Sequence, residues 1–444
     1  MRALLLAGAR LPDGAPAAAL RVAGLSLLER ALFVARDAGV TSAVVVADAA
    51  LHGGLRAAVR RQDVGVELTF ADPASERDRI LAGLGVGDPV AVVAADVAHT
   101  RHASPALKGA RPGDVLLEEK PESGGGPDAL RLGAGRTWLG LAVLGPERLG
   151  GLLEAAARDP AGGAAGALGA ELSGGGARGV PVPGLAWQLV RGAADAKAAR
   201  RMLFGSLVKP ADGWISRHLN RPISLSVSRV LVGLPVHPNH LSVLVFLISM
   251  AGCACVAWGD HYWLPILGAF LVQWGSILDG CDGELARLRY QGSLLGAWLD
   301  NAGDDLTTVV YSIAVAVNLG RFGHSPVWTW LGAATAVFAL IAIAVSYTYI
   351  VSIGSGCVQD FPSNVERAAV ARTPLRKLWG FIAYLSKRDT MDLIFLGLAV
   401  LGLLEVIATL FFLGAAATCF VFVRRRVEMR REARAGVSEG CGGA

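Results

Sequence analysis

Cysteine is scarce in this chain of 444 residues, and the cysteines present form no recognisable metal or disulfide pattern. No two of them are arranged as the C-x2-C pair that zinc sites commonly use. Their scattered positions give no sign of a disulfide framework either, so we expect free thiols. The six cysteines are Cys253, Cys255, Cys281, Cys357, Cys419 and Cys441.

Long apolar runs are absent from residues 1 to about 200, whereas they dominate residues 240–423. The mean hydropathy of the chain is +0.47, so we expect the second region to lie in lipid. The first ten residues, M-R-A-L-L-L-A-G-A-R, contain too short an apolar run for a signal peptide and predict a β-strand. The expected order is an α/β domain at 1–200 in the cytoplasm, an interfacial amphipathic segment at 206–236, a membrane domain at 237–426 and a basic, flexible cytoplasmic tail at 427–444.

Lysine and arginine are nearly absent from three short connections between apolar runs and are concentrated elsewhere. They are dense at 200–229, 367–388 and 424–434. Because basic loops stay on the cytoplasmic side, we expect these segments and both termini in the cytoplasm of a multi-pass cell (inner) membrane protein. Membrane spans interrupt the basic groups, which favours anionic lipid headgroups or phosphorylated substrates as partners over nucleic acid.

Six apolar segments predict transmembrane helices. The last two are short for a bilayer crossing, which needs about 20 residues, and one long helix is an alternative for them. A single helix would place Arg424 and its basic neighbours on the far side, and Gly402 with Glu405 offers a place to turn, so we favour six spans. The segments are 240–258, 263–287, 296–319, 327–351, 390–404 and 406–423.

Four aspartates stand between residues 279 and 304 with apolar segments on both sides. Asp279 and Asp282 are three residues apart and Asp300 and Asp304 four apart, so each pair lies along one face of a helix. Acids in a membrane segment are costly and are usually functional. Two facing helices would gather four carboxylates, which suit hard divalent cations. We expect two Mg²⁺ (or Mn²⁺) ions there, for phosphoryl chemistry.

The string D-G-C-D-G-E-L-A-R-L-R-Y-Q-G-S-L-L-G-A-W-L-D-N-A-G-D resembles the signature of the CDP-alcohol phosphotransferase family, D-x2-D-G-x2-A-R-x8-G-x3-D-x3-D, at all eight fixed positions. The resemblance implies a six-helix membrane enzyme that moves a substituted phosphoryl group from a CDP-alcohol to a second alcohol and releases CMP. Asp304 is the candidate general base as well as a metal ligand. The expected CDP-binding residues are Asp279, Gly283, Ala286, Arg287, Gly296 and Asn239, the last from a P-N dipeptide that related enzymes share.

The acceptor is less defined by the sequence. Basic residues at 209–224 and 364–387 have amphipathic spacing, and they fit either an acceptor phosphate or a solvated helix face. The acceptor is a small or lipid alcohol, with inositol phosphate one option. The candidate acceptor or phosphate-binding residues are Arg217, Arg221, Lys377 and Arg388.

Apolar runs at 2–9, 43–48 and 90–96 alternate with helical patterns, which predicts a parallel, Rossmann-like α/β sheet. This region resembles sugar-phosphate nucleotidyltransferases through L-A-G-A-R-L and A-G-L-S-L-L-E-R. Its Gly-rich loop is short, no lysine stands near residues 17–20, and Asp96 matches one metal-binding aspartate without an evident second one. We interpret the domain as degenerate, retained for packing, for dimer formation or for nucleotide sensing. Residues 108–136 and 159–182 are expected to be loops.

Together the halves resemble the bifunctional inositol-1-phosphate cytidylyltransferase / di-myo-inositol-phosphate-phosphate synthase group. In that group the soluble domain makes CDP-inositol and the membrane domain joins it to inositol phosphate. For this chain the resemblance implies a donor of the CDP-inositol type. Because the soluble domain lacks expected residues, a donor made elsewhere, of the CDP-diacylglycerol type, is the other option, and we expect a homodimer. One alternative is a bifunctional enzyme whose first domain also makes the CDP-alcohol from CTP. Two other classes remain open: a cation transporter and a nucleotide-sensing membrane protein.

Overall fold

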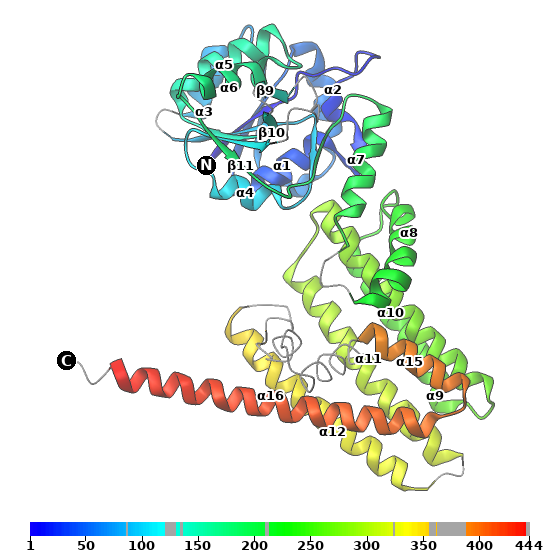
Figure 1. Cartoon of the computed structure of the whole chain (residues 1–444). Coiled ribbons are helices and arrows are strands. Elements are labelled where there is room, and N and C mark those ends of the chain that lie inside the picture. The colour runs from blue at the N-terminus through cyan, green and yellow to red at the C-terminus, as the bar shows by residue number, and fades with distance from the viewer. Residues whose placement is uncertain are drawn as a thin grey trace. The chain divides into compact units, whose positions relative to one another are not determined.

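The computed structural model describes residues 1–85, 88–119, 130–133, 136–208, 213–322, 325–354, 361 and 388–440. The chain divides into two compact units (Figure 1). The first comprises Met1–Leu207 together with Leu288–Tyr290, and the second comprises Val208–Arg287 and Gln291–Ala444.

A mixed β-sheet forms the centre of the first unit. Strand β1 pairs in parallel with β4 on one side and β6 on the other, and β4 pairs in parallel with β5. The three strands expected from the sequence are therefore confirmed. Beyond β6 the sheet is not parallel as expected, because β10 runs antiparallel to both β6 and β8. The sheet strands are β1 (Arg2–Leu6), β4 (Ser42–Val46), β5 (Glu67–Ala71), β6 (Val90–Ala94), β8 (Asp114–Glu119), β9 (Arg131–Gly133), β10 (Arg136–Leu144) and β11 (Arg178–Pro181).

Helices cover both faces of this sheet. Along β1, Leu5 packs in one hydrophobic cluster and Leu4 in another, because successive strand residues point to opposite faces. Helices α1 (Leu27–Asp37), α2 (His52–Ala58) and α4 (Ala103–Gly109) contribute to the first cluster, and α3 (Arg77–Leu84), α5 (Pro146–Arg158) and α6 (Gly163–Ser173) to the second. The unit is a three-layer α/β domain. Its smaller elements are η1 (Ala17–Ala19), β2 (Arg21–Val22), β3 (Leu25–Ser26), η2 (Ala49–Leu51), η3 (Gln62–Val64), β7 (Val97–His99), β12 (Trp187–Leu189) and α7 (Ala193–Gly205).

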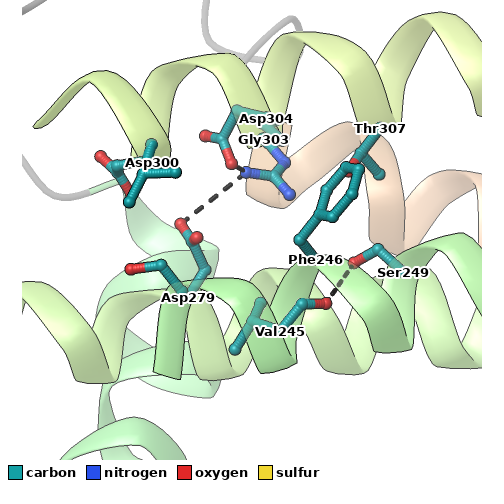
Figure 2. A pocket seen from close by; sticks show the side chains of 11 residues that line it. Val245, Phe246, Ser249, Asp279, Asp300, Gly303, Asp304 and Thr307 are labelled. Atoms are coloured by element: carbon teal, nitrogen blue, oxygen red, sulfur yellow. Dashed lines mark hydrogen bonds and ion pairs between the residues drawn. The ribbon is translucent and has the colours of Figure 1, made fainter. Parts of the chain in front are cut away.

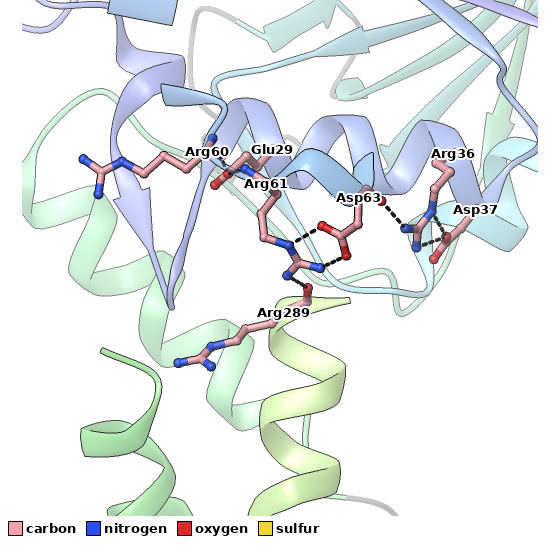
Figure 3. Close-up of polar contacts among 7 residues, drawn as sticks. All are labelled: Glu29, Arg36, Asp37, Arg60, Arg61, Asp63 and Arg289. Carbon is pink, nitrogen blue, oxygen red and sulfur yellow. Dashed lines mark hydrogen bonds and ion pairs between the residues drawn. The ribbon is translucent and has the colours of Figure 1, made fainter. Parts of the chain in front are cut away.

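Glu29 is a fully buried carboxylate whose hydrogen bonds organise the start of α1. Its Oε2 accepts from the backbone N–H of Ser26 at 2.9 Å, and the Ser26 hydroxyl accepts from the N–H of Glu29 at 3.0 Å. This reciprocal cap typically stabilises a helix by about 1 kcal/mol. The other oxygen, Oε1, accepts from the N–H groups of Arg60 and Arg61 at 2.9 and 3.1 Å (Figure 3). Both oxygens are thus satisfied, which is what makes the buried charge tolerable.

Two segments expected to be loops contain regular structure instead. The described part of 108–136 includes β8 and β9, and 159–182 contains α6 and β11. The small residues of α6 serve close packing: a Cβ added at Gly169 would lie 2.9 Å from the carbonyl oxygen of Leu132 in β9. A glycine- and alanine-rich composition therefore marks close contact between a helix and a strand at this position.

Each of the six helices expected in the second half is present. They are α9 (Pro238–Trp258), α10 (Trp263–Arg289), α11 (Leu294–Arg321), α12 (Val327–Ser352), α15 (Arg388–Val400) and α16 (Leu404–Gly440), preceded by η5 (Ser216–Asn220) and α8 (Arg221–Leu231). The alternative of one long final helix is wrong. Gly402 has a φ of +71°, which favours glycine and separates α15 from α16.

Four of these helices, α9, α10, α12 and α16 up to Arg431, are long and apolar enough to cross a membrane. Exposed tryptophans lie near helix ends, with Trp258 ending α9, Trp263 beginning α10 and Trp330 near the start of α12. Aromatic residues at such positions are typical of a membrane interface. The four helices indicate a membrane-embedded protein. The count of six spans stays a prediction.

The segment expected to be a cytoplasmic tail lies, up to Gly440, within helix α16. An ion pair between Arg424 Nε and Glu428 Oε1, at 2.9 Å and four residues apart, stabilises a helix in this region. The basic segment 364–387 lies outside the described residues.

Candidate metal centre

Carboxylates from α10 and α11 meet in the second unit. One oxygen from each of Asp279, Asp282 and Asp300 lies within 4.8 Å of the others. The first two are on the same face of α10, and the third comes from α11, whose first turn is capped where Ser293 Oγ accepts from the N–H of Gly296 at 2.9 Å. Figure 2 shows Asp279 facing Asp300 and Asp304 from a different helix. Carboxylates from two facing helices thus meet, as expected, for these three residues.

Asp304 lies beside these three aspartates and is paired with an arginine side chain. Arg388, the first residue of α15, forms an ion pair through Nη1 with Asp304 Oδ1, and the same nitrogen is 3.7 Å from Asp279 Oδ2. Arg388 was expected only as an acceptor-binding residue, and the structure places it among the motif carboxylates. A pocket opens between them, lined by Ser242, Val245, Phe246, Ser249, Asp279, Leu299, Asp300, Gly303, Asp304, Thr307 and Arg388.

The donor set fits a divalent metal ion. Three carboxylates converge, and carboxylate oxygens are the ligands that Mg²⁺ and Mn²⁺ prefer. Arg388 offsets part of the negative charge that four ionised carboxylates would carry, and divalent cations would offset more of it. This supports a divalent metal site at Asp279, Asp282 and Asp300.

Ser242 is a site residue that the sequence interpretation missed. Its hydroxyl, on α9, donates a hydrogen bond to Asp282 Oδ2. Ser242 stands three residues after Asn239, so both lie on one face of α9. That spacing was a usable signal, because Asn239 was already a candidate.

The expected CDP-binding residues form two neighbouring pairs. A Cβ added at Gly296 would lie 3.2 Å from Asn239 Oδ1, and one added at Gly283 would lie 3.6 Å from Arg287 Nη2. A side chain at position 296 would crowd Asn239, whereas a Cβ at position 283 would make only ordinary contact with Arg287. Ala286, one position before Arg287 on α10, is half-buried.

The candidate acceptor residues differ in their surroundings. Arg221 Nη1 donates to Glu284 Oε1 at 2.8 Å, and Ser224 Oγ donates to the same oxygen at 2.8 Å, which ties α8 to α10. Glu284 is fully buried, so Arg221 is its charge partner. Arg217 is exposed on η5, and Lys377 lies outside the described residues.

In the first unit, the aspartate expected to bind metal is paired with an arginine. Arg191 donates from Nε and Nη2 to Asp96 Oδ2 at 3.1 and 3.0 Å, while its own backbone N–H donates to Asp195 Oδ2 at 3.0 Å. Burial raises the pKa of the Asp96 carboxyl, and the Arg191 charge opposes that rise. Burial also lowers the pKa of nearby His99 to about 4, so this histidine is neutral at physiological pH. The positive charge beside Asp96 is therefore the guanidinium of Arg191.

Replacing Ser242 by alanine should weaken divalent cation binding about tenfold, because the hydrogen bond that orients the Asp282 carboxylate is lost. Calorimetric titration of the purified full-length protein with Mn²⁺ measures the change. The matched control is Ser226→Ala, since Ser226 is exposed on α8 and donates only to the Pro222 carbonyl. Equal affinity in the Ser242 variant and the native protein would contradict the positioning role.

Several known proteins are similar to part of this chain. A segment is 35% identical over 245 residues to the bifunctional IPC transferase and DIPP synthase of Thermococcus kodakarensis, covering 52% of this chain and 51% of that protein. The protein of the same name from Aquifex aeolicus is 37% identical over 170 residues, covering 38% and 36%. Cholinephosphotransferase 1 of Gallus gallus is 25% identical over 227 residues, covering 51% and 63%. The chain spans about half, or less, of the length of the two bifunctional relatives.

A solved structure of a putative glucose-1-phosphate thymidylyltransferase from Bacillus anthracis matches 45% of this chain and 94% of its own, at 14% identity and a TM-score of 0.36. Residues 235–368 match the CDP-alcohol phosphatidyltransferase family. This range includes Asn239, Ser242 and all four motif aspartates. The candidate site therefore lies within the part of the chain that matches this family.

Proposed function

We propose that this protein is a membrane-embedded transferase that moves a substituted phosphoryl group from a CDP-alcohol to an acceptor alcohol and releases CMP. The observation that carries the proposal is the convergence of Asp279, Asp282 and Asp300. Asp279, Asp300 and Asp304 also line a pocket between α9, α10 and α11. All eight signature positions fall within the family match at 235–368. Purified protein that releases CMP from no CDP-alcohol at any Mg²⁺ concentration would contradict it.

The proposed roles follow from position and chemistry. Asp279, Asp282 and Asp300 would hold divalent cations, two in our proposal, and bound cations would supply charge neutralisation at the donor diphosphate. Asp304 would accept the acceptor hydroxyl proton while that oxygen attacks the phosphorus and the bond to the CMP oxygen breaks. Arg287, whose guanidinium lies near Gly283, offers a forked donor to phosphate oxygens.

The substrate class rests on the relatives. Two of them are named IPC transferase and DIPP synthase and one cholinephosphotransferase. We infer a donor of the CDP-inositol or CDP-diacylglycerol type and an acceptor that is a small or lipid alcohol, including inositol phosphate. The reaction would serve phospholipid or inositol-phosphate synthesis.

We also propose that the first unit does not make the donor. Nucleotidyl transfer needs Mg²⁺ held by more than one carboxylate, and Asp96 is buried and bound by Arg191. The positive charge of Arg191 opposes a metal ion at the same oxygen. This disfavours the bifunctional alternative, although the named relatives are consistent with it.

The Asp279→Asn, Asp282→Asn and Asp300→Asn variants should lose CMP release by at least about a hundredfold, because each removes a charged ligand. Asp304→Asn should still bind CDP-alcohol with Mg²⁺ but fail to turn it over. CMP release and donor binding are measured separately on purified protein. The control is Asp260→Asn, an exposed acid in the connection between α9 and α10. Normal turnover by Asp304→Asn would remove the proposed base, and loss of donor binding there would make Asp304 mainly a ligand.

The full chain should release no pyrophosphate from CTP with inositol 1-phosphate and Mg²⁺, because Arg191 neutralises Asp96. The same preparation should release CMP from a supplied CDP-alcohol, which shows that the protein is active. Pyrophosphate release at an enzyme-like rate would instead make the bifunctional reading the leading one.

Both termini should lie on the cytoplasmic side of the cell membrane. The reason is that the basic segments at 200–229, before α9, and at 424–434, in α16, are retained inside. Cysteines placed at Asp260 and Arg430 in a cysteine-free background test this with an impermeant thiol reagent on intact cells. Both positions are exposed. We expect labelling at 260 and none at 430. Labelling at both would require an even number of spans between them and would place the C-terminus outside the cell.

A further inference from the structure

Arg388 lies between two sets of carboxylates. One side of its guanidinium contacts Asp304 and is 3.7 Å from Asp279, both from the metal-binding signature. Its Nε is 3.7 Å from Asp392 Oδ2, four residues later on the same helix. Asp392 belongs to neither the signature nor the family match at 235–368. The side chains of Arg388 and Asp392 are only 23% and 10% exposed, so neither charge is well solvated.

Asp392 has unused capacity to accept a hydrogen bond. Its Oδ2 is buried and has no hydrogen-bond partner among the described residues. This is the oxygen that faces Arg388 Nε. A buried carboxylate oxygen without a donor is costly, and it gains most from a guanidinium that moves closer.

Divalent cations and Arg388 compete for the same carboxylates. Asp279 belongs to the triad of oxygens within 4.8 Å and is also the neighbour of Arg388. Cations that bind Asp279 and Asp304 would repel the guanidinium at this distance. A partly buried arginine that moves away from its partners needs another anion to pair with. Asp392, one helical turn along α15, is such an anion, because its Oδ2 is already 3.7 Å from Arg388 Nε.

We propose that Arg388 is the internal counter-cation of the metal-free centre, and that Asp392 is a positioning residue that draws it away when divalent cations bind. The inference rests on the metal site of the proposed function. It assigns Asp392 a role in metal affinity that acts only through Arg388. With Arg388 on Asp392, the oxygens of Asp279 and Asp304 become available as ligands.

Mn²⁺ titration of the full-length protein, followed by the electron paramagnetic resonance signal of free Mn²⁺, tests the proposal. Asp392→Asn should weaken Mn²⁺ binding about tenfold, which corresponds to about 1.4 kcal/mol. Arg388→Gln should tighten it, because the competing cation is gone. In the Arg388→Gln background, Asp392→Asn should change the affinity less than about threefold. Asp392→Glu, which keeps the carboxylate, should restore affinity close to that of the native protein.

The double variant separates the proposed role from two simpler effects. If Asp392 acted only through its general negative field or through packing, Asp392→Asn would weaken Mn²⁺ binding equally with and without Arg388, and the proposal would be overturned. Weaker binding in Arg388→Gln would also overturn it. Asp389→Asn is the matched control. Asp389 is an acid next to Arg388 in the sequence, and its Oδ1 accepts a hydrogen bond from Ser276 Oγ at 3.5 Å. Failure of the native protein to bind Mn²⁺ would contradict the metal site itself, whereas native binding with unaltered variants would contradict only the role of Asp392.

Discussion

Repulsion among four carboxylates is the constraint on which the second unit depends. Oxygens of three of them lie within 4.8 Å of one another, and at an effective dielectric constant of about 20 each ionised pair at such a distance costs about 3 kcal/mol or more. Membrane-spanning helices provide little water to reduce that cost. The cluster therefore needs positive charge to be stable. This is the physical reason to expect a functional cation at these carboxylates.

The surrounding side chains act on this charge in different ways. Ser242 donates a hydrogen bond to Asp282, and Arg388 forms an ion pair with Asp304. Glu284, on the same helix as the triad, is separately neutralised by Arg221. On α10, Asp279 and Asp282 are the carboxylates that face the acids of α11, whereas Glu284 is paired with α8. This is the condition expected of a site that binds divalent cations together with an anionic diphosphate.

The signature acids and the helices were predictable because their information is local. Three- and four-residue spacing places Asp279 with Asp282 and Asp300 with Asp304, and apolar runs mark each helix. The position of Arg388 was not predictable, since it follows the signature by more than 80 residues and only the packing of α15 brings it to Asp304. For the same reason the pairing of Arg191 with Asp96 was missed. The prediction of a loop at 159–182 was wrong for α6, because alanine and glycine are common both in loops and in closely packed helices.

The central claim is that Asp279, Asp282, Asp300 and Asp304 form one centre for two divalent cations. Anomalous X-ray diffraction at the manganese edge, from crystals grown with Mn²⁺ and a CDP-alcohol, tests it most directly. The account predicts two neighbouring anomalous peaks bordered by these four carboxylates, with the donor diphosphate against them. A single peak, or peaks at other acids with this pocket empty, would contradict it.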